Sequence, residues 1–420
     1  MNLYKHQIDG LKKAEGQTHT AFYWDMGLGK TYAGSEKMMQ LGGQINLVVC
    51  QKSKIQDWIE HFTDNYHHMD MFSCDLTNSK EFQWFLTEPS LHPVVGIINY
   101  DLIWRRPELL NLPIDTLLLD ESSLIQNETA KRTKAILKLQ TKNVILLSGT
   151  PTGGKYERLW SQMHLLGWKI SKDLYWKQFV KVEYLDTIGR SVPLVVGYKN
   201  VDRLKRKMAD HGCQFLKTDE VFDMPDQTFQ KIMVATTPEY RTFRKDRFVT
   251  VGAEELVGDT TLTRMLYERQ LCSFYNNEKL QAFEDLLESC DDRLIVFYNF
   301  NRELGKLSEV CKKHDRPFSA VNGKIKRLKE YELKTNSVTF VQYQAGAMGL
   351  NLQKANKIIY FSLPLSSELY EQSKKRIHRI GQNRPCIYYL LLCRNSVEER
   401  ILETLNMRQD YTEALFEKGQ

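Results

Sequence analysis

A glycine-rich stretch near the start of the chain has the residue types that bind a phosphate chain. It reads Asp25, Met26, Gly27, Leu28, Gly29, Lys30 and Thr31. Backbone N–H groups in such a turn can surround phosphate oxygens, and glycines let the backbone approach the anion closely. The Lys30 amine can then reach the terminal phosphates, and the Thr31 hydroxyl can hold a magnesium ion. The strict motif has Gly where this chain has Trp24, so a plain turn before a helix is the alternative.

Two adjacent carboxylates, Asp120 and Glu121, follow an apolar run about ninety residues later. Carboxylates at the end of a buried strand are costly unless a cation lies beside them. Downstream of a phosphate-binding loop, Asp120 would hold magnesium through water, and Glu121 would polarise the water that attacks the γ-phosphate. An acidic cap of the next helix explains either residue alone, but it explains the pair less well.

Two arginines in the last quarter of the chain could complete a triphosphate site. Arg376 and Arg379 lie within residues 372–382, and their spacing predicts that they share one face of a helix. A guanidinium has a fixed charge and a planar fork, which suits a γ-phosphate that gains charge as it leaves. A basic helix that faces nucleic acid or solvent is the alternative. Residues 344–352, just upstream, contain glycines that permit close approach to a backbone or a ligand.

Polar residues elsewhere in the first half have possible roles beside the same site. Ser148 and Thr150 follow another apolar run, and their hydroxyls could sense phosphate or the acid pair and relay its state. A plain turn before a helix fits that spacing equally well. Gln7 could use its amide as donor and acceptor against the edge of an adenine, although a lone glutamine is more often a solvated surface residue.

Apolar runs predict the strands that would position these residues. They lie at residues 45–50, 94–98, 116–119 and 144–147 in the first half, and at 294–297, 338–341, 358–361 and 387–393 in the second. Runs without polar alternation are typical of strands covered on both faces, which indicates parallel sheets with helices between them. The sequence therefore predicts an α/β fold with two successive sheets.

The two sheets predict two domains. The N-terminal domain would cover residues 1–224, with a helical, aromatic-rich insert at about 155–224. The C-terminal domain would cover residues 225–420, with a helical entry segment at about 237–290. Because the second half has no further Gly-Lys-Thr motif, we expect two lobes that close on one nucleotide.

Composition is consistent with an intracellular protein. The chain has 420 residues, of which 42% are hydrophobic and 26% are charged, and its net charge of +6 is compatible with a polyanionic partner. Its eight cysteines form no C-x-x-C pair, which is typical of reduced thiols. No apolar leader opens the chain, and the longest apolar run is far too short to span a membrane. We expect no membrane partner and a location in a bacterial cytoplasm or a phage-infected cell.

Taken together and in this order, the motifs resemble those of superfamily-two helicase ATPases, most closely the Swi/Snf-related branch. The resemblance runs from Tyr4 to about Ile401 and includes the string Arg-Ile-His-Arg-Ile-Gly-Gln that begins at Arg376. It implies two RecA-like lobes, with the nucleotide in the cleft between them and nucleic acid running across both. The implied cofactors are ATP and magnesium.

The resemblance also implies a role for each matching residue. Gln7 would contact adenine, residues 25–31 would bind phosphates, and Thr31 and Asp120 would hold magnesium. In the second lobe, Gly349 and Asn351 would contact ATP and backbone. The catalytic residues would be Glu121, Arg376 and Arg379, and the residues that couple ATP to DNA would be Thr150 and Gln372.

Two departures from the family pattern lie on the implied route between ATP and DNA. Ser123 stands where the family usually has His, and Gly153 and Gly154 replace a polar pair. Stimulation by DNA is therefore less firmly predicted than hydrolysis. We expect a minimal phage or bacterial translocase that tracks along duplex DNA by backbone contacts with little sequence preference. A strand-separating DNA or RNA helicase and a non-hydrolysing DNA-binding scaffold are the alternatives.

Overall fold

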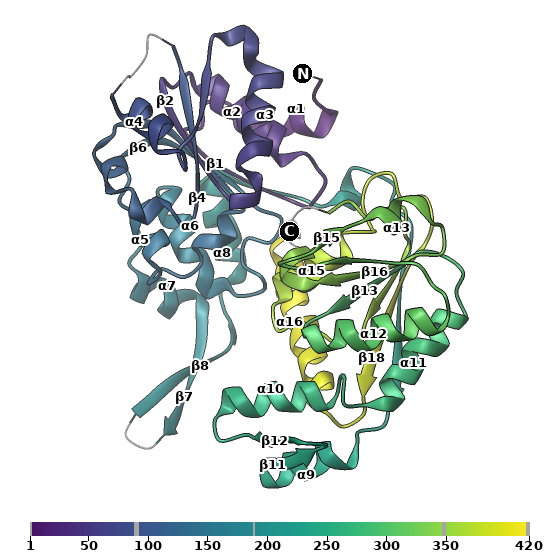
Figure 1. The fold of residues 1–420 in the computed structure, drawn as a ribbon. Coiled ribbons are helices and arrows are strands. Elements are labelled where there is room, and N and C mark those ends of the chain that lie inside the picture. Colours follow the sequence, from purple (N-terminus) through teal and green to yellow (C-terminus); the bar gives the residue numbers. More distant parts are fainter. Residues whose placement is uncertain (1, 88–91, 188–189, 347–349, 417–420) are drawn as a thin grey trace. The chain divides into compact units, whose positions relative to one another are not determined.

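The computed structural model of the chain describes residues 2–87, 92–187, 190–346 and 350–416 (Figure 1). The chain divides into two compact units: unit 1 comprises Met1–Val221 with Asp410–Gln420, and unit 2 comprises Phe222–Gln409. Each unit contains a seven-stranded sheet flanked by helices. The predicted α/β fold with two successive, mainly parallel sheets is confirmed.

The sheet of unit 1 has the strand order β3-β4-β2-β5-β6-β1-β9, and every neighbouring pair is parallel. Its strands are β1 (His19–Trp24), β2 (Ile45–Cys50), β3 (Phe72–Asp75), β4 (Val94–Asn99), β5 (Ile114–Asp120), β6 (Thr141–Leu147) and β9 (Cys213–Leu216). Because β5, β6 and β1 are neighbours and parallel, their carboxyl ends meet at one edge of the sheet. The polar segments that follow these three strands are therefore brought together there.

Eight α-helices belong to the described part of unit 1 before its final residues. They are α1 (Lys5–Lys13), α2 (Lys30–Leu41), α3 (Ile55–Tyr66), α4 (Ser79–Thr87), α5 (Lys131–Ile136), α6 (Trp160–Leu165), α7 (Lys172–Phe179) and α8 (Val201–Asp210). An antiparallel hairpin of β7 (Val180–Thr187) and β8 (Arg190–Tyr198) extends from the rest of the unit (Figure 1). The prediction of a helical insert at about 155–224 missed this hairpin and β9.

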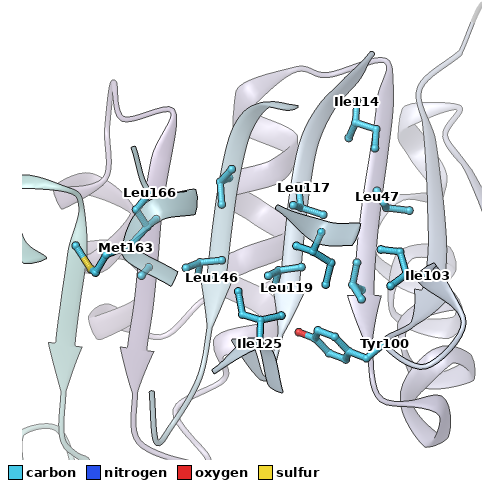
Figure 2. Close-up of a cluster of buried hydrophobic side chains, with 14 of the residues drawn as sticks. Leu47, Tyr100, Ile103, Ile114, Leu117, Leu119, Ile125, Leu146, Met163 and Leu166 are labelled. Atoms are coloured by element: carbon cyan, nitrogen blue, oxygen red, sulfur yellow. The ribbon is translucent and has the colours of Figure 1, made fainter. Parts of the chain in front are cut away.

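The core of unit 1 lies on the sheet. Figure 2 shows leucine side chains of β2, β5 and β6, among them Leu47, Leu117 and Leu146, packed with residues from flanking segments. These three side chains are fully buried, and burial of each contributes about 1.5–3 kcal/mol relative to exposure. On the other face, a Cβ added at Gly34 of α2 would lie 2.9 Å from the side chain of Leu147. Glycine therefore lets α2 pack closely on the sheet directly behind the loop that joins β1 to α2.

The sheet of unit 2 has the order β10-β18-β17-β13-β16-β14-β15, parallel except for the short edge strand β15. Its strands are β10 (Gln227–Val234), β13 (Leu294–Tyr298), β14 (Phe318–Val321), β15 (Lys326–Arg327), β16 (Val338–Gln342), β17 (Lys357–Tyr360) and β18 (Cys386–Cys393). A small separate hairpin consists of β11 (Phe248–Val251) and β12 (Glu254–Val257). The eight strands predicted from apolar runs all exist in the two main sheets.

The helices of unit 2 flank this sheet, and the last of them, α16, continues past Gln409 into residues that belong to unit 1. They are α9 (Pro238–Asp246), α10 (Thr261–Leu271), α11 (Asn277–Glu288), α12 (Asn301–Lys313), α13 (Lys329–Leu333), α14 (Tyr343–Gly346), α15 (Ser367–Lys374) and α16 (Val397–Phe416). Among the residues that the structure describes, no helix has both the length and the apolar character that crossing a membrane demands.

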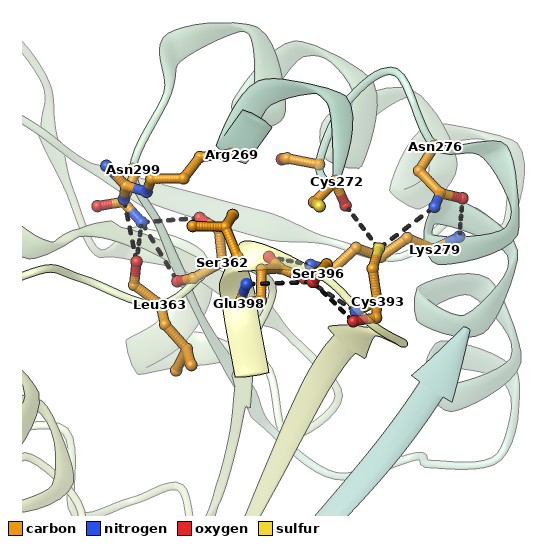
Figure 3. Close-up of polar contacts among 12 residues, drawn as sticks. Arg269, Cys272, Asn276, Lys279, Asn299, Ser362, Leu363, Cys393, Ser396 and Glu398 are labelled. Carbon is orange, nitrogen blue, oxygen red and sulfur yellow. Dashed lines mark hydrogen bonds and ion pairs between the residues drawn. The ribbon is translucent and has the colours of Figure 1, made fainter. Parts of the chain in front are cut away.

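A buried polar network joins the end of β18 to α11 and α16 (Figure 3). Lys279 of α11 and Glu398 of α16 form an ion pair at 2.5 Å, and both side chains are almost completely buried. Glu398 also accepts a hydrogen bond from the backbone N–H of Cys393 at 3.0 Å. The charge of Glu398 raises the pKa of Lys279 against the opposing effect of burial. Each of the two charges therefore requires the other, because either charge alone would be buried without compensation.

Candidate functional site

The loop between β1 and α2 has a backbone shape that depends on glycine. Gly27 and Gly29 have φ values of 88° and 69°, in the left-handed region that side chains disfavour. Gly29 is the residue before the first turn of α2, which begins at Lys30. The loop therefore leads directly into a helix N-terminus, whose unpaired N–H groups favour an anion.

Gln7 supports this loop from beneath. Its side chain is 2% exposed, and its Nε2 donates hydrogen bonds to the carbonyl oxygens of Leu28 and Gly29, both at 3.2 Å. Its Oε1 accepts a hydrogen bond from the backbone of Tyr4 at 2.8 Å. A Cβ at Gly29 would lie 2.2 Å from Gln7 Nε2, so the contact requires glycine there. Gln7 thus positions the loop, and its contact with adenine stays a prediction.

The loop is also anchored through its first residue and its lysine. Lys30 Nζ donates to the carbonyl oxygens of Trp24 and Asp25, at 2.8 and 3.0 Å. The Asp25 carboxylate accepts hydrogen bonds from the N–H and the hydroxyl of Thr218, both at 3.1 Å. Asp25 therefore ties the loop to the segment after β9. Met26 lies beside Gly149, since a Cβ added there would be 3.4 Å from Met26 Cγ and 3.6 Å from Lys30 Nζ.

Asp120 is the last residue of β5, and its carboxylate is held by an indole. Trp58 Nε1 of α3 donates a hydrogen bond to Asp120 Oδ2 at 2.9 Å. Burial raises the pKa of Asp120, with a smaller increase from the charge of Glu121, while the Trp58 hydrogen bond and the charge of Lys30 lower it; the net shift is upward. A carboxylate that is costly to ionise in this surrounding would gain from a cation.

The donor set fits a magnesium ion. Among the described residues, Asp120 Oδ1 accepts no hydrogen bond, and the hydroxyl of Thr31 in the first turn of α2 makes none. Carboxylate and hydroxyl oxygens are ligands that magnesium prefers. Asp120 and Thr31 are therefore the residues that would hold it, and this role stays a prediction.

Glu121 has an unusual backbone and a well-defined side chain. Its φ of 61° is uncommon for a residue with a side chain, and such residues are often found at functional sites. Its Oε1 accepts hydrogen bonds from the hydroxyls of Ser123 and Ser148, at 2.8 and 2.7 Å. The Tyr100 hydroxyl donates to the backbone oxygens of Asp120 at 3.0 Å and of Glu121 at 3.3 Å. Side chain and backbone of Glu121 are thus both held in place.

The segment that begins at Ser148 is joined to the acid pair by hydroxyl groups. Ser148 Oγ also accepts a hydrogen bond from the backbone N–H of Thr150 at 3.2 Å. The Thr150 hydroxyl is buried and has no hydrogen-bond partner among the described residues. Gly153 and Gly154, one of the two departures from the family pattern, have φ values of 54° and 73°, which explains glycine at both positions.

Gln162 of α6 links the segments that follow β5 and β6. It accepts hydrogen bonds from Ser122 Oγ at 2.7 Å and from the Tyr23 hydroxyl at 3.0 Å, and it donates to the Pro151 carbonyl oxygen at 2.7 Å. Sequence reasoning missed both Gln162 and Trp58. The buried face of α3 carried a signal for Trp58, which lies at helical spacing from Ile55 and Phe62.

In unit 2 the two arginines lie outside a regular helix. α15 ends at Lys374, residues 375–377 form a turn and 378–379 a bend, so the prediction that both share one helical face is wrong. Arg376 is 7% exposed, and its Nη1 donates to the Leu350 carbonyl oxygen at 3.4 Å. Arg379 is half-buried, and its guanidinium has no hydrogen bond or ion pair with any described residue. Burial lowers the pKa of Arg379, and no carboxylate opposes this effect.

For the remaining predicted residues of unit 2 that it describes, the structure gives their exposure but no contact with a ligand-binding group. Asn351 is exposed. Gln372 is buried on α15, and its Oε1 has no partner within the described chain. Gly349 lies outside the described residues. The structure thus brings Gln7, residues 25–31, Asp120, Glu121 and Ser148 together in unit 1, and it joins Arg376 to the backbone of residue 350 in unit 2.

Comparisons with known proteins match both halves of the chain. Residues 15–275 match the model of the SNF2-related domain, and residues 278–381 match that of the helicase conserved C-terminal domain. Similar proteins include the CHD3-type chromatin-remodeling factor PICKLE of Arabidopsis thaliana, 22% identical over 96% of this chain and 33% of its own length. The ATP-dependent helicase MG018 of Mycoplasma genitalium is 22% identical over 97% of this chain and 42% of its own length.

The SWI/SNF-related matrix-associated actin-dependent regulator of chromatin subfamily A-like protein 1 of Xenopus tropicalis is 23% identical over 95% of this chain and 43% of its own length. This chain therefore spans between a third and about two fifths of these relatives. A solved structure titled as the Sulfolobus solfataricus SWI2/SNF2 ATPase core in complex with dsDNA is 19% identical, with a TM-score of 0.47, over 98% of this chain and 92% of that one. The family matches confirm the resemblance stated from the sequence.

Proposed function

The chain belongs to the SNF2-related family of helicase-class ATPases, and we propose that it couples ATP hydrolysis to movement along duplex DNA. One observation carries the proposal: Lys30 follows β1, and Asp120 and Glu121 lie at the carboxyl end of β5, so all three are at the same edge of the parallel unit 1 sheet, where β6 separates the two strands. A phosphate-binding lysine, a magnesium carboxylate and a water-polarising carboxylate are the groups that phosphoryl transfer to water needs.

Each residue of this edge has a defined task in the proposal. The loop of residues 25–31 and Lys30 bind the phosphates, and Thr31 and Asp120 hold the magnesium ion. The ion, when bound, neutralises charge that develops on the phosphate oxygens. Glu121 accepts a proton from the attacking water, and the two serine hydroxyls on its Oε1 leave its other oxygen, Oε2, for that contact.

Arg379 is the better candidate of the two arginines for stabilising the transferred phosphoryl group. Its half-buried guanidinium has no partner among the described residues, and it can therefore bind an anion without breaking an existing contact. Arg376 instead donates to the Leu350 carbonyl, which supports a second task of holding the segment that contains Asn351. The roles of Gly349, Asn351, Thr150 and Gln372 remain proposals from family resemblance.

DNA is proposed as the track on two grounds. Similar proteins are named as chromatin-remodeling factors, and the chain has a net charge of +6. Contacts to phosphates rather than base edges would give little sequence preference and a strong dependence on salt. Movement along the duplex without strand separation is preferred to unwinding, because the β11–β12 hairpin of unit 2 is short and buries Val249 and Leu256 in the core.

The test is phosphate release with duplex DNA, single-stranded DNA, RNA or no nucleic acid. We expect the largest stimulation with duplex DNA. Lys30→Ala should weaken nucleotide binding, and Glu121→Gln should keep binding but stop turnover. Lys142→Ala is the matched control, because this exposed lysine pairs with Asp115 near the amino-terminal ends of β5 and β6.

Movement itself needs a second assay, such as displacement of a third strand from a duplex. Displacement that depends on ATP, together with an intact forked duplex, would support translocation. Unwinding of the fork would instead identify a strand-separating helicase. Absence of turnover under every condition would leave a non-hydrolysing scaffold and would contradict the proposal.

A further inference from the structure

A groove on unit 2 lies between α10 and α16, and the nucleotide chemistry does not use it. It forms a cavity of about 450 Å³, lined by Thr261, Met265 and Glu268 of α10, by one face of α16, and by Leu365. Helix α10 follows the β11–β12 hairpin in the chain, and α16 follows the last strand of the sheet (Figure 1). The groove is therefore built from segments about 140 residues apart in the sequence.

The floor of the groove is apolar. Val397, Ile401 and Leu405 of α16 lie at helical spacing and are buried. Met265 and Leu365 stay 36% and 46% exposed, respectively, so the groove presents large apolar side chains to solvent. The lining of α16 runs from Val397 to Arg408, which at 1.5 Å per residue is about 16 Å, or three helical turns. That length matches a partner helix with apolar residues at i, i+4 and i+7.

The rim of the groove is positively charged. Arg264, Arg400 and Arg408 line it, and Glu268 is the only acidic lining residue among those described. Glu268 is nearly buried and is already paired, with Arg264 Nε at 2.9 Å and with Arg400 Nη2 at 3.6 Å. The Arg400 side chain is 58% exposed. Arg264 and Arg400 share this single carboxylate, so one positive charge is in excess around the apolar floor even when Arg408 is left out of the count.

From this combination we propose that the groove binds an amphipathic helix of a partner protein whose polar flanks carry Asp and Glu. The exposed Met265 and Leu365 favour an apolar helix face over a nucleic acid, which would leave this apolar surface uncovered. The arginine rim favours acidic flanks over basic ones. The groove belongs to unit 2, whereas Lys30, Asp120 and Glu121 belong to unit 1. None of its lining residues has a task in the proposed hydrolysis, so occupation of the groove is a separate property.

The test uses the full chain and a fluorescent synthetic helix of about fourteen residues, long enough for the three turns of the groove. Its apolar face carries Leu at i, i+4, i+7 and i+11, its other positions are Glu and Ala, and a second version has Lys in place of Glu. Fluorescence anisotropy should show saturable binding of the acidic helix, and binding should weaken as salt rises. The basic helix should bind at least tenfold more weakly.

Two variants with matched controls locate the binding. Met265→Glu and Arg400→Glu should each weaken the acidic helix at least tenfold. Leu333→Glu, at a 66% exposed leucine of α13, and Lys312→Glu, at an exposed lysine of α12, should not change binding. Phosphate release should be unchanged in all four variants, and unaltered thermal unfolding would show that they fold.

Three results would overturn the proposal. The first is equal binding of the acidic and the basic helix. The second is an equal loss of binding in the Met265 variant and in its Leu333 control. The third is a short DNA duplex that binds the wild-type chain, displaces the helix and is lost in Arg400→Glu, which would identify a nucleic-acid surface instead.

Discussion

The two hydroxyl groups that hold Glu121 provide a sharp test of the catalytic arrangement. Ser148 and Ser123 both donate to Glu121 Oε1, at 2.7 and 2.8 Å. Ser148→Ala removes one of these bonds at a fully buried position and leaves the carboxylate itself in place. If the bond keeps Glu121 aimed at the attacking water, its loss should lower kcat and leave nucleotide affinity unchanged.

The size of the effect follows from the kind of bond. A hydrogen bond to a charged group contributes about 1.5–3 kcal/mol, which corresponds to a roughly 10- to 150-fold loss of kcat if all of it is expressed in the transition state. Ser148→Ala also removes the acceptor of the Thr150 N–H, so we expect a larger loss than for Ser123→Ala. The double variant should lose more than either single variant, because the carboxylate then has neither donor.

The matched control is Ser122→Ala. Ser122 lies beside Glu121 in the chain and is equally buried, but its hydroxyl donates to Gln162 instead of the carboxylate. Steady-state phosphate release at saturating ATP and duplex DNA gives kcat, and fluorescent-nucleotide titration gives affinity. If Ser122→Ala and Ser148→Ala lowered kcat equally, the serines would act through packing, and the proposed orientation of Glu121 would be refuted.

Three further changes test other parts of the structure. Arg379→Ala should lower kcat about 10³-fold or more with ATP affinity nearly unchanged, and its thermal unfolding should not be weakened; equal activity to wild type would remove Arg379 from the mechanism. Lys279→Met should cost about 3–5 kcal/mol in urea unfolding, because Glu398 stays buried without its partner, and adding Glu398→Leu should recover part of that loss; no recovery would contradict the pairing argument. Burial lowers the pKa of His61 to about 4 from 6.5, so the unfolded chain binds a proton first as pH falls. Stability is therefore present above pH 6.5 and is lost from there towards pH 4, by at most about 1.4 kcal/mol per pH unit and by less because the ring is partly exposed; an unchanged slope in His61→Gln would contradict this.

The main sheets could be predicted because their central strands are continuous apolar runs. β5 and β18 have this pattern, which physical chemistry assigns to strands covered on both faces. β10 could not be predicted in the same way, because it is an edge strand whose first five residues are exposed. Its place is set only by pairing with β18, about 160 residues later. The β7–β8 hairpin was likewise missed, since its partners are chosen by pairing rather than by burial.

The candidate site also contains residues that the sequence could predict and residues that it could not. The loop at residues 25–31 and the acid pair were predictable, because a phosphate-binding turn needs glycine and lysine at fixed spacing. Trp58 and Gln162 were not, because each meets its partner only after folding: Trp58 lies 62 residues before Asp120, and Gln162 lies 40 residues after Ser122. The motif can be recognised from residues that are close together in the sequence, whereas the residues that orient it come from distant elements.

The state of Arg379 separates a ligand-binding charge from a structural one. Elsewhere in unit 2, buried charges are satisfied by the fold: Lys279 pairs with Glu398, and the Glu303 carboxylate accepts hydrogen bonds from the backbone N–H groups of Asn299 and Phe300 at 2.7 and 2.8 Å. Arg379 is desolvated, and no hydrogen bond or ion pair within the described chain compensates for this. The charge of Arg379 therefore does not stabilise the folded chain. If Arg379 had a structural role, Arg379→Ala would lower stability. If it binds phosphate, Arg379→Ala should leave stability unchanged or raise it while turnover is lost. Measuring both quantities on one variant distinguishes the two roles.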